Sequence, residues 1–358
     1  MFASLKKLPA VVIVGIVLVL LFPAYSMWNH SMLKARIQNE CLDPRKELQD
    51  CYYAHYKSVA HTEGSAAAVK ELHERRESDD LLKVNCHEVM HEIGRAAYDE
   101  RGSIADAYAH ADFSCWGGYL HGVVEASMRG KKLPDVASTT IRTMCDSVKG
   151  DGERSFTHFS CVHGIGHALM FVSDNDLMTV LERCDDLVDI WEIRQCANGA
   201  FMQNMFSNYD DHASDFIDKN DLRYPCNIIR EDEQGICYQV QSKVIIDGLG
   251  GDFQKAFRFC GDLASSTLSA ACTSGLGAAV SLYSMYDTKR IAALCSETPS
   301  SVLGESCLYG ALTDLEGASG STSLGKTVCS NIPQERQGAC LDILLRAHAD
   351  FPGKAMNE

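Results

Sequence analysis

The regular spacing of the cysteines constrains the fold of this chain more than any other feature. The sequence has sixteen cysteines, and from residue 145 onward they fall into consecutive pairs whose second members recur at intervals of 35, 41, 35, 35 and 33 residues. A period in this range is typical of stacked two-helix repeats. The pairs are Cys145/Cys161, Cys184/Cys196, Cys226/Cys237, Cys260/Cys272, Cys295/Cys307 and Cys329/Cys340.

The residues around each pair predict a disulfide at a helix junction. Residues 256–260 look like the end of one helix, and after a short polar stretch Ala271 to Gly275 are predicted to open the next. Each disulfide would close a short loop and contribute about 2–4 kcal/mol in the chain-entropy model. A glycine follows three residues after Cys115, Cys161, Cys196, Cys272 and Cys307. On a helix that offset shares the cysteine's face, so a neighbouring helix can approach closely there.

The earlier cysteines extend the series toward the N-terminus. Cys86 and Cys115, with 28 residues between them, fit as its first repeat, and Cys41 and Cys51 would clip a short N-terminal cap. We therefore predict an all-α fold, a disulfide-stapled helical-hairpin repeat array of the α-solenoid kind with about seven repeats. Spacing alone leaves other connectivities open.

In period and cysteine placement, residues 145–340 resemble the Sel1-like, cysteine-rich helical repeat proteins of bacteria, which also pair cysteines across helix junctions. Their Leu-Gly-x-x-Tyr-x-x-Gly signature is missing here. The resemblance therefore implies a shared architecture and not family membership.

The N-terminal residues predict export. Lys6 and Lys7 precede an uncharged apolar run from Leu8 to about Tyr25. A helix of this length just spans the hydrocarbon core, and the lysines predict that the short N-terminal side stays in the cytoplasm. The alternative is a cleaved signal peptide with a small-x-small site at residues 24–26. Both interpretations export the rest of the chain, where an even number of cysteines would form disulfides.

These features divide the chain into six segments and predict a single-pass protein of the cell membrane, whose bulk is extracytoplasmic (periplasmic or extracellular). The membrane is then one partner, through the N-terminal helix. The segments are a cytoplasmic N-terminus (1–7), a transmembrane anchor or signal sequence (8–28), an N-terminal cap and linker (29–84), His/Glu-rich metal-binding repeats (85–210), disulfide-linked helical repeats (211–350) and a tail (351–358).

The charge balance argues against nucleic acid as a partner. The chain has 33 basic and 48 acidic residues and a formal net charge of −15. Binding to nucleic acid through counterion release needs a basic face, and the sequence has no such face.

The histidines, unlike the cysteines, gather in the first three repeats. Each of these repeats has two candidate ligands four residues apart, which places them on one helix face about 6 Å from each other. The pairs are His87 with His91, His121 with Glu125, and His163 with His167. A single pair of this kind is more often coincidence than a metal site. Three pairs at nearly equivalent repeat positions predict a site for a transition metal: zinc, iron or copper.

The later repeats lack this feature. His91, His121 and His167 lie five, six and six residues after their cysteines. At the six-residue offset the later repeats carry Met202, Lys243, Ala278 and Thr313. The predicted site is therefore confined to the N-terminal half.

One enzymatic hypothesis starts from His87-Glu88-x-x-His91, which resembles the zincin metallopeptidase motif. The resemblance implies that His87 and His91 bind zinc, that Glu88 activates water, and that Glu125 or His121 completes the site. The zincin pattern does not account for His163 and His167, and no edge strand to hold a peptide is visible.

Two further hypotheses use the whole cluster. Five histidines and one glutamate suit a binuclear or redox site, a layout loosely similar to helical-repeat di-iron hydroxylases, and a bis-histidine haem stays open. Alternatively, the metal stabilises a scaffold whose repeat surface binds a protein or peptide. A metal-dependent enzyme of the cell envelope is the preferred prediction, with the reaction open between hydrolysis and redox chemistry.

Overall fold

A computed structural model describes residues 48–149, 154–206, 214–319 and 321–350. These residues form helices, turns and bends, and none of them is in a strand. The all-α, disulfide-linked fold predicted from the sequence is therefore confirmed. The predicted membrane helix, Cys41 and the tail lie outside the described residues. Within the described ranges, no helix has both the length and the apolar character needed to cross a membrane.

The chain divides into two compact units, residues 1–58 and 59–358. Of the first unit the structure describes only the beginning of α2, so the architecture below is that of the second unit. The helices in chain order are α2 (Leu48–Glu63), α3 (Ser65–Arg76), α4 (Asp80–Val84), α5 (Cys86–Arg101), α6 (Ile104–Tyr108), η1 (Cys115–Gly117), α7 (Gly118–Met128), η2 (Leu133–Asp135), α8 (Ser138–Thr143), η3 (Asp146–Val148), α9 (Phe156–Val172), α10 (Leu177–Cys184), α11 (Ile190–Phe206), α12 (Glu231–Val240), α13 (Ser242–Gly248), α14 (Phe253–Gly261), α15 (Ser266–Tyr283), α16 (Thr288–Ser296), α17 (Ser301–Ser319), α18 (Ser323–Ser330) and α19 (Gln334–Asp350).

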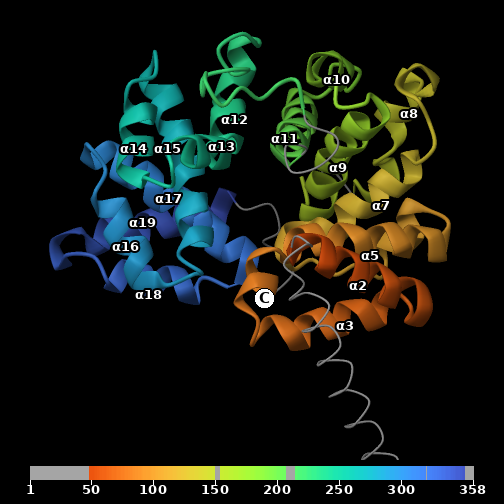
Figure 1. The fold of residues 1–358 in the computed structure, drawn as a ribbon, viewed down its shortest axis with the longest axis horizontal. Helices are drawn as coiled ribbons and strands as arrows, with labels where there is room; N and C mark the ends of the chain where they lie inside the picture. The colour runs from red at the N-terminus through yellow and green to blue at the C-terminus, as the bar shows by residue number, and fades with distance from the viewer. Residues whose placement is uncertain (1–47, 150–153, 207–213, 320, 351–358) are drawn as a thin grey trace, which may run out of the picture. The chain divides into compact units, whose positions relative to one another are not determined.

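One set of helices packs in chain order. Each of α5, α7, α9, α11, α12, α15, α17 and α19 contacts the next member of this set. The succession from α5 through α7 and α9 to α11 can be followed in Figure 1. The short helices α10, α14, α16 and α18 each pack on the longer helix that follows them. Short and long helices therefore alternate from α14 to α19, whereas α12 and α13 before them are both short.

Seven of the predicted disulfides are present, from Cys86–Cys115 to Cys329–Cys340, with Cα–Cα distances of 5.4–5.9 Å. One detail of the prediction was wrong. The second cysteine does not open its helix: α15 begins at Ser266, six residues before Cys272. The helix begins earlier because the Ser265 side chain accepts a hydrogen bond from the backbone N–H of Leu268, which is a favourable N-cap.

Glycines let neighbouring long helices approach at backbone contact. A Cβ atom on Gly118 would lie 2.2 Å from the His87 carbonyl oxygen, and one on Gly122 would lie 2.0 Å from that of His91. The same contact recurs further along, where a Cβ on Gly310 would lie 1.8 Å from the Ser274 oxygen. Such distances exclude any side chain. The glycines three residues after Cys115, Cys196, Cys272 and Cys307 therefore have the role that the sequence predicted, whereas Gly164, three residues after Cys161, meets the Val124 side chain.

The turn before α7 has an unusual backbone conformation and contacts a helix that is distant in the sequence. Cys115 and Trp116 have left-handed φ values of 53° and 58°, which non-glycine residues rarely adopt. The Trp116 indole N–H donates to Asp314 on α17 at 3.1 Å. A Cβ on Gly317 would lie only 2.1 Å from the Trp116 ring. The second unit therefore has a contact between its first repeats and α17, which a simple linear array would lack.

Candidate metal centre

Three consecutive long helices bring all six predicted ligands together. α5 contributes His87 and His91, α7 contributes His121 and Glu125, and α9 contributes His163 and His167. Within each of three groups, the candidate ligand atoms all lie within 4.8 Å of one another. These groups could hold a metal ion, and they are His87/His91/His121, His121/His163/His167 and His91/Glu125/His167.

Two pairs of histidines face each other through the same ring atom. The Nε2 atoms of His87 and His91 are 3.1 Å apart, and so are the Nε2 atoms of His163 and His167. Both pairs have the four-residue helical spacing that the sequence analysis singled out. This geometry suits chelation of one ion by two imidazole nitrogens.

The other ring nitrogen, Nδ1, fixes the tautomer of His87 and His91. His87 Nδ1 donates to the backbone carbonyl of Cys115 at 2.9 Å, and His91 Nδ1 donates to the Glu125 carboxylate at 2.7 Å. A carbonyl and a carboxylate only accept, so both Nδ1 atoms carry the proton. In the neutral rings, two Nε2 lone pairs therefore face each other at 3.1 Å. That arrangement is repulsive unless a proton or a metal cation lies between them.

Glu125 is the charged anchor of the cluster. The Arg95 guanidinium donates to one of its carboxylate oxygens, and His91 donates to the other. Burial opposes ionisation of Glu125, but His91 and Arg95 outweigh burial and hold the pKa of this carboxyl well below its usual range. Glu125 thus orients His91 and also lies 4.0 Å from His167 Nδ1.

Most of the histidines are held in the neutral form that binds metals. Burial lowers the pKa of His87, His121 and His163 well below the ordinary value, and neighbouring histidines add to this effect. Burial and His91 lower the pKa of His167 to about 4. His91 is the exception: burial favours its neutral form, but Glu125 prevails and raises its pKa.

Two side chains that position the cluster were missed in the sequence. Gln203 on α11 accepts a hydrogen bond from His167 Nδ1 at 2.9 Å, with its amide oriented for this contact. Arg95 lies one turn after His91 on α5. Its i+4 spacing from a predicted ligand could have identified it, whereas Gln203 has no comparable signal.

Access to the cluster differs between its two ends. His121, His163 and His167 are buried, whereas His87 and Glu88 are partly exposed at the start of α5. Burial raises the pKa of Glu88, against the influence of His91. Solvent therefore reaches the cluster most easily at the His87 end, where the zincin hypothesis places the general base.

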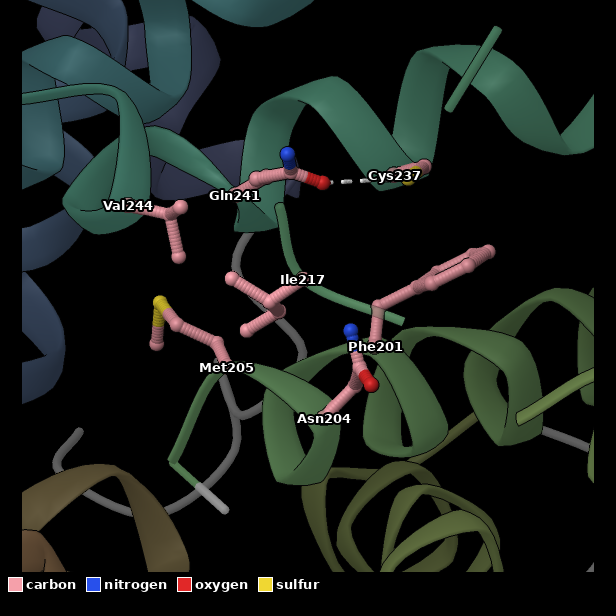
Figure 2. A pocket seen from close by; sticks show the side chains of 7 residues that line it. All are labelled: Phe201, Asn204, Met205, Ile217, Cys237, Gln241 and Val244. Atoms are coloured by element: carbon pink, nitrogen blue, oxygen red, sulfur yellow. Dashed lines mark hydrogen bonds between the residues drawn. The ribbon is translucent and has the colours of Figure 1, made fainter. Parts of the chain in front are cut away.

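A separate small pocket of about 10 Å³ lies between α11 and the α12–α13 segment. Figure 2 shows its lining, which comprises Phe201, Asn204, Met205, Ile217, Cys237, Gln241 and Val244. Small-molecule sites usually occupy about 300–1,000 Å³. The Gln241 amide already donates to the carbonyls of Leu222 and Tyr224. The histidine cluster is therefore the stronger candidate for function.

Comparison with known proteins adds no relative: no protein-family model, no curated protein and no solved structure matches this chain. The functional assignment therefore rests on the cluster itself.

Proposed function

We propose that the protein is an exported, membrane-anchored metalloprotein whose His/Glu centre carries a metal-dependent enzymatic activity. One observation carries this proposal: the Nε2 atoms of His87 and His91 face each other at 3.1 Å while both Nδ1 atoms donate elsewhere. Two imidazole nitrogens held this close share either a proton or a cation, and a transition-metal ion that displaces the proton gains both nitrogens as ligands. The second facing pair, on α9, repeats the contact between Nε2 atoms, and there only His167 Nδ1 has a partner, Gln203.

Hydrolysis is the reaction that the exposed end of the cluster favours. His87 and His91 would hold the ion, and Glu88 would take a proton from the attacking water. The raised pKa makes the Glu88 carboxylate a stronger proton acceptor near neutral pH. A general base is most effective when its pKa lies close to the working pH. The partial exposure of Glu88 and His87 lets a substrate reach this end.

Redox chemistry at a binuclear centre is the second enzymatic candidate. Five histidines and Glu125 exceed what a closed four-ligand structural zinc site needs. Imidazole also suits copper and iron, so the ligand set alone does not select zinc.

The burial of the α7 and α9 ligands favours a third candidate, a metal-stabilised scaffold. His167 has no exposed surface and His121 is 2% exposed, so an ion bound there would join α7 to α9 without meeting a substrate. The repeat surface would then bind a protein or peptide partner.

The proposed location and architecture belong to the same hypothesis. The apolar segment 8–28 would anchor the chain, with the repeats outside the cytoplasm, where seven disulfides would persist. The alternating short and long helices would be hairpin repeats of an α-solenoid-like array.

Elemental analysis of the full chain, purified without chelator or histidine tag, tests the proposal together with an optical spectrum. Zinc without visible absorption would support the hydrolase or scaffold, and iron or copper would support redox chemistry. A folded chain that binds no transition metal would contradict the proposal. The Glu88→Gln variant then separates hydrolysis from the scaffold: it should abolish hydrolysis and leave the metal content unchanged.

A further inference from the structure

His121 differs from every other histidine in the cluster. Neither of its ring nitrogens has a hydrogen-bond partner among the described residues, although the side chain is only 2% exposed. Buried polar atoms are almost always paired, so two orphaned nitrogens on one buried ring need an explanation. In contrast, His87, His91 and His167 each have an Nδ1 partner outside the histidine set.

The position of His121 is between the two facing pairs. Its ring centroid lies 5.2 Å and 5.3 Å from those of His87 and His91. On the other side, it lies 4.6 Å and 5.4 Å from those of His163 and His167. His121 accordingly belongs to two of the candidate metal groups, one with each pair.

The helix packing holds His121 in this place. Gly122, the next residue on α7, allows backbone contact with His91 on α5. On the other side, a Cβ on Gly164 of α9 would lie 3.3 Å from the His121 Cα. The ring is therefore held between α5 and α9, within reach of both pairs at once.

We propose that the cluster binds two divalent transition-metal ions, one on His87 and His91 and one on His163 and His167, and that the His121 ring bridges them. This inference rests on the proposed function and makes it more specific. One nitrogen of His121 binds each ion, so both orphaned atoms gain a partner. As the second ion binds, the N–H bond of neutral His121 breaks and its proton passes to solvent. The ring remains as an imidazolate, and neither metal changes oxidation state.

Cu²⁺ loading with electron paramagnetic resonance tests this proposal on the full chain. We expect two ions per chain by elemental analysis. An imidazolate bridge couples their spins, so the signal of isolated Cu²⁺ should be largely lost. In His121→Ala the two ions should give that isolated signal at full intensity. The matched control is His158→Gln on α9, a buried histidine paired with Glu192 outside the cluster, which should keep the coupled state.

The outcomes separate this proposal from the proposed function. Two uncoupled ions in the unmodified chain would overturn the bridge. A single ion per chain would overturn the two-ion centre but leave a metalloprotein, and no ion would overturn both. Because the coupling is measured in the unmodified chain, a misfolded His121 variant would not obscure the result.

Discussion

Within the second unit, α5, α7 and α9 in the N-terminal half pack in the same way as α15 and α17 in the C-terminal half. The two halves differ in the side chains that lie at these helix contacts. On both sides, a glycine lets a long helix touch the backbone of the preceding one, at Gly122 against His91 and at Gly310 against Ser274. Disulfides of similar span link the helices in both halves. Only the first half places histidines at the contact. Helix packing and metal chemistry are thus encoded by different residues, and the close approach does not depend on the histidines.

Metal removal should distinguish the two halves most strongly. For an ion present at about a thousand times its dissociation constant, removal costs about 4 kcal/mol of unfolding free energy. We expect a chelator to increase amide hydrogen exchange in α5, α7 and α9 and to leave α15 and α17 unchanged. If amide exchange became equally faster in all five helices, metal binding would stabilise both halves of the unit and not only the first.

The contact that joins the halves should make stability depend on pH. Burial raises the pKa of Asp314 to about 8, despite the hydrogen bond from Trp116. An aspartate in an unfolded chain titrates near 3.9, so the unfolded state loses its proton first. The stabilising contribution of protonated Asp314 is fully present below about pH 4 and is lost as pH rises through about 8.

Between pH 5 and pH 8 the expected loss of unfolding free energy is roughly 3 kcal/mol. Urea denaturation across this range measures it. Asp314→Asn should flatten the dependence of unfolding free energy on pH. The same change at the exposed Asp262 should leave that dependence unchanged. An Asp314→Asn profile as steep as that of the unmodified chain would refute the assignment.

Alanine at the equivalent glycines should destabilise both halves but affect metal binding in only one. The added Cβ would meet a backbone oxygen in Gly122→Ala and in Gly310→Ala alike, so each should lose about 1–3 kcal/mol in urea denaturation. In zinc titrations, only Gly122→Ala should bind more weakly, because it displaces His91 and His121. A matching loss of affinity in Gly310→Ala would show that the two halves are coupled.

The smallest expected effect concerns Gln203. Leucine there removes the acceptor that orients His167, and loss of such a partner typically weakens metal binding about 10- to 100-fold. Zinc titration measures this, with Gln239→Leu on the exposed side of α12 as the control. If both variants bound zinc as tightly as the unmodified chain, Gln203 would have no orienting role.

The features predictable from the sequence are those that repeat. Cysteine spacing predicted seven of the disulfides, the glycine offset predicted the close helix contacts, and the four-residue spacing predicted which six side chains converge. Gln203 could not be predicted, because a single glutamine has no counterpart in the other repeats. Nor could the bond between Trp116 and Asp314, whose partners are 198 residues apart with no pattern linking them.

That long-range bond also restricts how such a chain can evolve. Repeat proteins commonly gain or lose whole copies, because each unit touches only its neighbours and the array tolerates a change in length. Here, duplication or deletion of one repeat between residues 116 and 314 would move Asp314 and Gly317 away from the indole that they contact. Copy number between these residues is therefore fixed by geometry, and sequence change in this interval is restricted to substitution and to loops that leave the helix count intact.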